Sequence, residues 1–321
     1  MKWITIGCWL ICSASFAHDS TDWRTDSSAF LSARVVQNQP NTGGSVFRVF
    51  PENISMEYLK QKLSEFSGAI PTVVDGQTVT ISERQSAKGR ELSLRYLIQE
   101  YQALGFKVTS HQFSSGVNFI AERTGSDPGK VLILSSHIDS VGNAGANDDG
   151  AGTISVLAVA QSLKNLKLTA TLRVLGFDRE EVGLVGSAAY VKSLPSLPSV
   201  IGNIQIEMMA TNQKKDGRFH VIDCDRPDST GLSAQIMNAV VALKLPLQRV
   251  AACTTRSDHA SFWSAKLPAI VLSENFFGGD GDPCYHAQCD KADARLDFDY
   301  MANITAAVAM ASANILGARA K

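Results

Sequence analysis

Leu132-Ile133-Leu134-Ser135-Ser136-His137-Ile138-Asp139 is an apolar run that ends in a His-x-Asp motif, and Asn147-Asp148-Asp149-Gly150-Ala151-Gly152 follows it. The apolar part predicts a buried strand. A side chain at the carboxyl end of a strand points into the crevice where open α/β sheets bind ligands. His137 and Asp148 are therefore candidate metal ligands at such an edge. Asp139 can hold the other ring nitrogen of His137 and fix its tautomer.

Helix and strand patterns alternate on both sides of this run. The spacing predicts helices over residues 56–66, 87–104, 151–163, 186–194, 231–243 and 298–316. It predicts strands over residues 106–113, 117–122, 131–136, 173–177, 201–208, 219–224 and 270–273, and an irregular, partly extended loop over 70–81. The alternation indicates an α/β fold, a three-layer sandwich with a central mixed, mostly parallel β-sheet flanked by helices. No internal repeat or low-complexity tract appears, so one catalytic domain is expected over residues 45–321.

Two adjacent acids, Glu180 and Glu181, come after the strand-like run at residues 172–177. Successive side chains at a strand end or turn point in different directions, so the two cannot share one role. One can bind a metal while its neighbour faces a metal-bound water. Such a water has its pKa lowered to about 7, and a nearby carboxylate can take its proton and pass it to a leaving amine.

Two further candidates lie in the second half of the chain. Glu207 interrupts the apolar run at residues 204–209, and a buried acid is costly unless it is paired or bound to a metal. His286 lies in the segment 283–290. Zinc prefers imidazole nitrogen and carboxylate oxygen, and a catalytic site keeps one position for water. The two histidines and the acids therefore supply the parts of a two-zinc hydrolase.

Each motif taken alone also has an ordinary structural explanation. A lone histidine beside a strand, such as His137, is more often a hydrogen-bonded structural residue than a ligand. Asp148 and Asp149 could be acids at the N-terminus of a helix, where the helix dipole favours negative charge. Residues 178–181 could be a solvated charge cluster on a loop. Only the combination of these motifs favours a metal site.

The order of the motifs resembles the zinc aminopeptidases of the M28 peptidase family, the group of the secreted bacterial leucyl aminopeptidases. The resemblance covers roughly residues 55–318 and implies the zinc exopeptidase fold. Its specific pieces are five segments in the family's order, namely residues 136–139, 145–152, 180–184, 257–263 and 285–286.

The resemblance implies a role for each matched residue and two zinc ions per chain as the cofactor. The implied ligands are Asp148 bridging both ions, His137 and Glu207 completing one site, and Glu181 and His286 completing the other. Glu180 would be the general base, and Tyr285 resembles the family's oxyanion-stabilising tyrosine. In such enzymes two metals about 3.5 to 4 Å apart polarise the scissile carbonyl.

Further expectations follow from the same resemblance. Asp139 and Asp149 would support the ligands without coordinating, and the peptide bond between Asp148 and Asp149 would be cis. The chain departs from the family at two positions, because the family commonly has Asp where Glu207 stands and a third acid where Asn147 stands. Neither departure removes a carboxylate from the implied ligands. The histidine of Ser257-Asp258-His259 would be structural.

The composition excludes a role in nucleic-acid binding. The chain has 321 residues, 45% of them hydrophobic, and a formal net charge of −1. No excess of positive charge attracts a polyanion, and lysine and arginine are dispersed. The helix at residues 298–316 contains Asn303 and Asn314 and suits packing on a sheet better than a membrane span. Peptide substrates, a monomeric state and no stable membrane insertion after signal cleavage are expected.

The N-terminal segment predicts export. Residues 1–17 contain Lys2, an apolar run at 3–11 and small residues at the usual cleavage positions, which is typical of a secretory signal peptide. Neither Cys8 nor Cys12 follows a good lipobox, so a lipoprotein anchor is disfavoured. Residues 18–44 are polar and are interpreted as a leader or pro-segment. A secreted or periplasmic location follows.

Four cysteines remain once the signal peptide is removed, and an oxidising compartment favours disulfides. Three pairings are possible. We favour Cys284 with Cys289 and Cys224 with Cys253. The first pair would close a short loop around His286 and restrict how that ligand moves.

The first functional hypothesis is a secreted zinc exopeptidase that removes N-terminal, preferably apolar, residues from peptides. Met208, Phe276, Phe277 and Tyr285 lie near the predicted ligands and could form an apolar pocket wall, although each could equally be core. The alternatives are a glutaminyl cyclase-like enzyme with one zinc, an M28 carboxypeptidase in which Arg256 holds the substrate carboxylate, and a catalytically silent binding domain. The remaining histidines, His18, His111 and His220, are interpreted as structural or exposed.

Overall fold

The computed structural model of the protein describes residues 54–194 and 199–320. All described residues belong to one compact unit. The predicted signal peptide at residues 1–17, the predicted leader at 18–44 and His18 lie outside the described residues.

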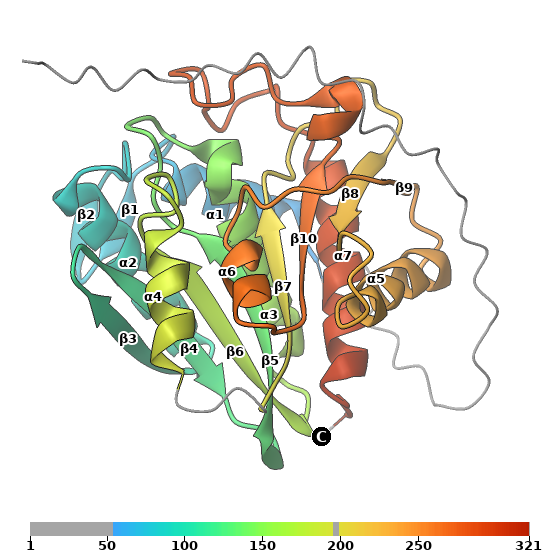
Figure 1. The fold of residues 1–321 in the computed structure, drawn as a ribbon. Coiled ribbons are helices and arrows are strands. Elements are labelled where there is room, and N and C mark those ends of the chain that lie inside the picture. Colours follow the sequence, from blue (N-terminus) through green and yellow to red (C-terminus); the bar gives the residue numbers. More distant parts are fainter. Residues whose placement is uncertain (1–53, 195–198, 321) are drawn as a thin grey trace, which may run out of the picture. The chain divides into compact units, whose positions relative to one another are not determined.

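A mixed eight-stranded sheet forms the centre of the fold (Figure 1), with the strand order β3-β4-β6-β5-β7-β10-β8-β9. The strands are β3 (Lys107–Phe113), β4 (Gly116–Arg123), β5 (Asp127–His137), β6 (Ala170–Phe177), β7 (Val200–Glu207), β8 (Arg218–Ile222), β9 (Gln248–Val250) and β10 (Ala269–Glu274). The pairs β6–β5, β5–β7, β7–β10 and β8–β9 are parallel, and β3–β4, β4–β6 and β10–β8 are antiparallel. The predicted mixed, mostly parallel sheet is therefore confirmed. The three-residue strand β9 was not predicted.

A second, two-stranded sheet corrects the prediction of an irregular loop over residues 70–81. The strands β1 (Thr72–Val74) and β2 (Gln77–Val79) pair antiparallel. The residues between them, Asp75 and Gly76, both have positive φ (49° and 76°). Asp-Gly is a favoured two-residue hairpin turn because its twist matches that of the flanking strands. The turn signal was present in the sequence and was missed.

Helices cover both faces of the large sheet. Those on one face are α1 (Met56–Phe66), α2 (Ala87–Ala103), α3 (Gly152–Leu163), α5 (Thr230–Ala242) and α7 (Phe298–Ile315). On the other face lie α4 (Val185–Ser193) and the unpredicted six-residue helix α6 (His259–Ser264), which are in front of the sheet in Figure 1. The six predicted helices begin and end within one residue of the observed ones. The predicted three-layer sandwich is confirmed.

Strand alternation separates two apolar cores. In β5, Leu132 and Leu134 belong to the core under α3 and α7, whereas Val131 and Ile133 belong to the core under α4 and α6. Successive side chains of a strand point to opposite faces, so an unbroken apolar run is needed when both faces are covered. Full burial of one such aliphatic side chain stabilises the folded state by roughly 1.5 to 3 kcal/mol. None of the helices described here combines the length and the apolar character that a membrane span requires.

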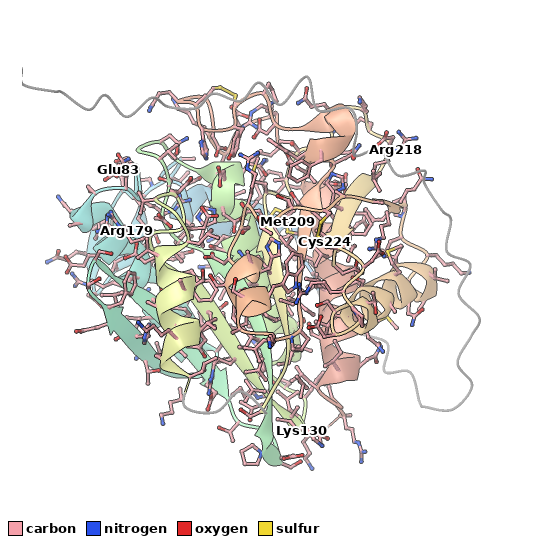
Figure 2. All side chains as sticks on the ribbon, in the orientation of Figure 1. Glu83, Lys130, Arg179, Met209, Arg218 and Cys224 are labelled. Atoms are coloured by element: carbon pink, nitrogen blue, oxygen red, sulfur yellow. A yellow bond between two sulfur atoms is a disulfide. The ribbon has the colours of Figure 1, made fainter. Side chains whose placement is uncertain are left out.

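One edge of the sheet collects the functional candidates. Because β6, β5, β7 and β10 run parallel, their carboxyl ends lie at the same edge. Lys130, near the start of β5, and Met209, after the end of β7, lie at opposite ends of the sheet in Figure 2. The strand ends at His137 and Glu207 therefore face the same crevice.

Candidate metal centre

The five residues predicted as metal ligands converge at this edge. Nε2 of His137 lies 3.1 Å from Oδ1 of Asp148 and 3.4 Å from Oε1 of Glu207. Nε2 of His286 lies 3.2 Å from Oδ2 of Asp148 and 3.0 Å from Oε2 of Glu181. The two oxygens of Asp148 thus face two different histidines, each accompanied by its own glutamate.

The electrostatics of this cluster suit cations. Burial opposes protonation of His286, but its bonds to Asp148 and Glu181 outweigh that effect and raise its pKa to about 9. Burial raises the pKa of Glu181, and one of its oxygens, Oε1, is buried without a hydrogen-bond partner among the described residues. A buried carboxylate oxygen is costly unless a partner or a metal satisfies it. The donor set of imidazole nitrogen and carboxylate oxygen is the one that zinc takes.

Asp139 supports the cluster mainly through the turn after β6. Its carboxylate accepts hydrogen bonds from the backbone amides of Glu180 (3.0 Å) and Glu181 (3.3 Å). Nδ1 of His137 lies 3.2 Å from the backbone oxygen of Asp139 and 3.6 Å from its carboxylate. The backbone oxygen is therefore the nearer partner of the ring, where the sequence predicted the carboxylate.

Asp149 ties three elements together. Oδ1 accepts hydrogen bonds from the amides of Gly152 (3.0 Å) and Met208 (3.1 Å), and Oδ2 accepts one from the amide of His137 (3.3 Å). The peptide bond between Asp148 and Asp149 is cis, as the resemblance implied. Asp149 thus links β5, the end of β7 and the start of α3.

Arg84 positions the loop between His137 and Asp148, a role that no sequence pattern indicates. Its side chain is fully buried, and Nε and Nη2 donate to the carbonyls of Ile138 (2.9 Å) and Gly145 (2.7 Å). Nη1 donates to the carbonyl of Ala144. Gly145 has φ +54°, and a Cβ there would lie 2.6 Å from Nη2. The loop therefore closes directly on the guanidinium.

Asn147, where the family commonly has an acid, has a physical reason to be an amide. It lies in the one-turn element η3 (Ala146–Ala151), and its Nδ2 donates to Glu274 (2.9 Å) and Asp282 (3.0 Å). Both acceptors are buried carboxylates. An aspartate at this position would repel them instead of donating to them.

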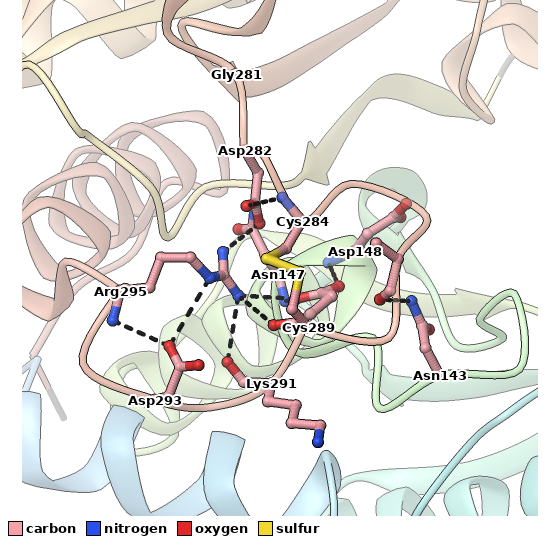
Figure 3. Close-up of a disulfide and its surroundings, with 12 residues drawn as sticks. Asn143, Asn147, Asp148, Gly281, Asp282, Cys284, Cys289, Lys291, Asp293 and Arg295 are labelled. Atoms are coloured by element: carbon pink, nitrogen blue, oxygen red, sulfur yellow. Dashed lines mark hydrogen bonds and ion pairs between the residues drawn. A yellow bond between two sulfur atoms is a disulfide. The ribbon is translucent and has the colours of Figure 1, made fainter.

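The turn that carries His286 is held covalently and by ion pairs (Figure 3). A disulfide joins Cys284 and Cys289, and Arg295 donates to Asp282 at 2.5 Å beside it. Asp290 accepts a hydrogen bond from the backbone amide of Asp148 (3.0 Å), which connects this turn to the cluster of predicted metal ligands. The second disulfide joins Cys224 and Cys253, so both favoured pairings are present.

Glu180 and Tyr285 line a cavity of about 310 Å³ next to the cluster. The ring of Tyr285 stacks on that of His286, with centroids 3.8 Å apart. Nη2 of Arg256 donates to the Tyr285 hydroxyl at 3.3 Å. The four predicted wall residues, Met208, Phe276, Phe277 and Tyr285, all line this cavity, together with the unpredicted Leu184, Ile222 and Val271.

The segment after Cys253 contributes a contact that sequence reasoning missed. Oγ of Ser257 donates to Oε2 of Glu207 at 2.7 Å. His259 stays outside the metal cluster, because its Nε2 bonds to the carbonyl of Thr254 (2.9 Å) and its ring packs edge-on against Trp263. In the sequence, only the Ser257-Asp258-His259 motif indicated that this segment lies near the site, and it drew attention to the histidine instead of the serine.

His220 and His111 also lie outside the cluster. His220 is fully buried and hydrogen-bonds to Val250 and Phe277. His111 is partly buried, and its Nδ1 lies 3.2 Å from the side-chain amide nitrogen, Nδ2, of Asn118. Both are structural, as the sequence predicted.

Comparison with known proteins places this site in a family. Residues 118–312, more than half of the chain, match Peptidase family M28. The chain belongs to this family, and the resemblance seen in the sequence is confirmed.

Curated relatives include the leupeptin-inactivating enzyme 1 of Streptomyces exfoliatus, 32% identical over 226 residues, which cover 63% of this chain and 50% of that protein. Leucine aminopeptidase 2 of Arthroderma otae is 31% identical over 198 residues, which cover 55% of this chain and 40% of the relative. The chain thus spans about half the length of these relatives or less.

Solved structures share the fold at low sequence identity. The zinc aminopeptidase BSAP of Bacillus subtilis superimposes with a TM-score of 0.71 at 14% identity, covering 82% of this chain and 95% of that one. The glutaminyl cyclase of Bacteroides thetaiotaomicron gives a TM-score of 0.65 at 15% identity, with coverages of 80% and 97%. Peptidases and a cyclase share this fold, so the fold alone does not decide between the two activities.

Proposed function

We propose that the protein is an exported aminopeptidase that holds two zinc ions and removes N-terminal, preferably apolar, residues from peptides. The single observation that carries the proposal is the position of Asp148, whose two oxygens face two histidine–glutamate pairs. In this proposal Asp148 would supply one oxygen to each of two metal positions. Similarity to the aminopeptidases among the curated relatives supports the reaction class.

The residues present fit two zinc ions. His137 and Glu207 would hold one ion, and Glu181 and His286 would hold the other, since each histidine lies on its own oxygen of Asp148 and each glutamate lies beside its histidine. When bound, the two ions would polarise the scissile carbonyl and activate the attacking water. The unsatisfied Oε1 of Glu181 supports this assignment.

The chain's own groups would perform the proton transfers and hold the substrate. Glu180 lines the cavity beside Glu181 and would take the proton of the water and deliver it to the leaving amine. The hydroxyl of Tyr285 would donate a hydrogen bond to the developing oxyanion. Phe276 and Met208 would contact the apolar side chain at the N-terminus of the substrate.

The second metal position separates this proposal from the glutaminyl cyclase alternative. A single zinc would need only one histidine–glutamate pair, yet His137 lies within 3.4 Å of Glu207 and within 3.1 Å of Asp148. Two disulfides and the predicted signal peptide support export. A monomer remains our expectation, which light scattering tests.

Metal content measured together with activity tests the proposal. We expect two zinc ions per chain, hydrolysis of aminoacyl anilides, loss of activity with a chelator and recovery with zinc. His137→Gln should reduce the metal content to one ion, whereas the matched control His111→Gln should leave it at two.

Three outcomes of this experiment would contradict the proposal. Cleavage of N-blocked but not C-blocked peptides would indicate a carboxypeptidase. Formation of pyroglutamate from glutaminyl peptides by a protein with one zinc would indicate the cyclase. Full zinc loading without turnover of any of these substrates would indicate a silent binding domain.

A further inference from the structure

We infer that Arg256 forms a carboxylate-binding subsite at the rim of the cavity, and that the preferred substrates are dipeptides with a free C-terminal carboxylate. This inference rests on the proposed aminopeptidase function and names its substrate class. The ligand would be a zwitterion that places its ammonium group at one end of the cavity and its carboxylate at the other.

The charges lining the cavity are divided in the way such a substrate requires. The acids that line it are Asp148, Glu180, Glu181 and Glu207. Among the described residues that line it, Arg256 is the only arginine or lysine. A guanidinium presents its N–H groups as a planar fork that matches a carboxylate in a bidentate way.

Most N–H donors of the Arg256 guanidinium are not used by the described residues. Within residues 54–194 and 199–320, its side chain contributes one hydrogen bond, from Nη2 to the Tyr285 hydroxyl at 3.3 Å. It forms no ion pair with any carboxylate in the described part of the chain, and the residue is exposed at the rim. A guanidinium carries five N–H donors, so most of them remain available to a ligand.

The rim segment that carries Arg256 is fixed before any ligand arrives. The disulfide between Cys224 and Cys253 anchors it three residues upstream. His259 bonds to the carbonyl of Thr254 (2.9 Å), and the amide of Arg256 donates to Oγ1 of Thr254 (3.2 Å). Downstream, Ser257 donates to Glu207. The second disulfide and His259, which take no part in the metal cluster, therefore acquire a role in holding this segment.

The distances suit a short substrate. Arg256 contacts Tyr285, the Tyr285 ring stacks on His286, and His286 lies 3.0 Å from Glu181. Two side chains thus separate the guanidinium from the acidic end of the cavity. Two extended residues span about 7 Å. The cavity of about 310 Å³ is at the low end of the roughly 300–1,000 Å³ of ligand pockets.

Arg256 could alternatively act only on the hydroxyl of Tyr285. In that case its loss would slow every substrate by the same factor, whether or not the substrate ends in a carboxylate. The two roles therefore differ in the ratio of activities on a free acid and on its amide.

The test compares kcat/KM for Leu-Gly and Leu-Gly amide with the zinc-loaded protein. The intact protein should prefer the free acid by about threefold to tenfold, because a charge-assisted bidentate contact at a solvent-exposed rim has a modest effect. Arg256→Gln should bring the ratio of activities on the free acid and the amide to about one, and Arg256→Lys should restore part of the preference. Lys130→Gln removes one positive charge at the other end of β5 and should leave the ratio unchanged.

Binding provides a readout that does not need turnover. Calorimetry of the zinc-loaded Glu180→Gln protein should show tighter binding of Leu-Gly than of its amide, and Arg256→Gln in the same background should remove the difference. Hydrolysis of both peptides with no acid preference, or a preference that survives Arg256→Gln, would overturn the subsite and leave the aminopeptidase intact. Binding preference without hydrolysis by the intact protein would overturn the aminopeptidase and leave the subsite. Absence of binding and of hydrolysis would overturn both.

Discussion

Nε2 of His220 accepts a hydrogen bond from the backbone amide of Phe277 at 3.1 Å, while its Nδ1 donates to the carbonyl of Val250 at 2.9 Å. Burial lowers the pKa of His220, so the ring is neutral and its tautomer is fixed by the two partners. This bond joins β8 to the turn that carries the phenylalanine wall of the cavity, η4 (Phe276–Asp280). A histidine remote from the metal cluster therefore positions the apolar wall.

Replacing His220 by phenylalanine should weaken substrate binding and leave the chemical step unchanged. The ring remains but the acceptor for the Phe277 amide is lost, which costs about 1 kcal/mol. We expect KM for leucyl substrates to rise about threefold to tenfold, with kcat changed less than twofold. Steady-state kinetics measures the split, and His111→Phe is the matched control. An equal loss in kcat would show that the wall also takes part in the chemistry.

Glu180→Gln should separate metal binding from catalysis. The amide has nearly the same shape as the carboxylate but cannot accept the proton of the attacking water. Turnover should fall by about 10²- to 10⁴-fold, while elemental analysis still finds two zinc ions per chain. Retained activity would remove Glu180 from the proposed mechanism, and loss of zinc would reassign it as a ligand.

Arg84→Met should destabilise the protein strongly, even without metal. Three buried carbonyls, those of Ile138, Ala144 and Gly145, would lose their donor at a cost of about 1 to 3 kcal/mol each. We expect urea unfolding of the chelated protein to show a loss of at least about 3 kcal/mol. Arg95→Met removes an exposed ion pair with Asp75 and should cost less than about 1 kcal/mol. Similar losses in both variants would contradict the role of Arg84.

The two disulfides should differ in what their removal changes. Loop-closure entropy gives about 3.5 kcal/mol for the 29-residue separation of Cys224 and Cys253 and about 2 kcal/mol for the 5-residue separation of Cys284 and Cys289. The variant with serine at both Cys224 and Cys253 should therefore be the less stable. The variant with serine at both Cys284 and Cys289 should show the larger loss of zinc affinity in chelator competition, because that loop carries His286. The reverse order of zinc affinities would contradict the positioning role of the short loop.

His259 should make stability depend on acid pH. Burial lowers the pKa of His259 to about 4, below the ordinary value of about 6.5 in an unfolded chain. Protons therefore bind the unfolded chain more readily, so the contribution is complete above pH about 6.5 and is lost as the pH falls toward 4. The loss is on the order of 3 kcal/mol. His259→Gln keeps a donor for Thr254 but does not titrate, so the unfolding free energies of the two proteins should converge between pH 7 and pH 4. A difference in unfolding free energy that stays constant with pH would contradict this prediction.

The helices were predictable because their starts are marked locally. Ser55, Ser86 and Asp297 each accept a hydrogen bond from an amide in the first turn of α1, α2 and α7. Such capping residues define a helix start without tertiary information. Among the elements that escaped prediction, β9 and α6 have three and six residues. So short a segment shows no periodicity, and only its packing against the sheet makes it regular.

The candidate site was predictable where a ligand ends a strand, as His137 and Glu207 do. The pairing of each histidine with its own glutamate came from resemblance, because no local pattern says which distant residues meet. Arg84 could not be predicted, since it acts on carbonyls 54 to 61 residues away. Ser257 was missed for the same reason, as its partner Glu207 is 50 residues away.

The position of Arg84 also bears on where this domain can be cut. The segment that matches the family begins at residue 118, yet the guanidinium that closes the loop between His137 and Asp148 comes from 34 residues before it. An expression fragment trimmed to the matched segment would keep every proposed ligand and lose the group that sets their spacing. Recombinant versions of this protein should therefore start upstream of α1.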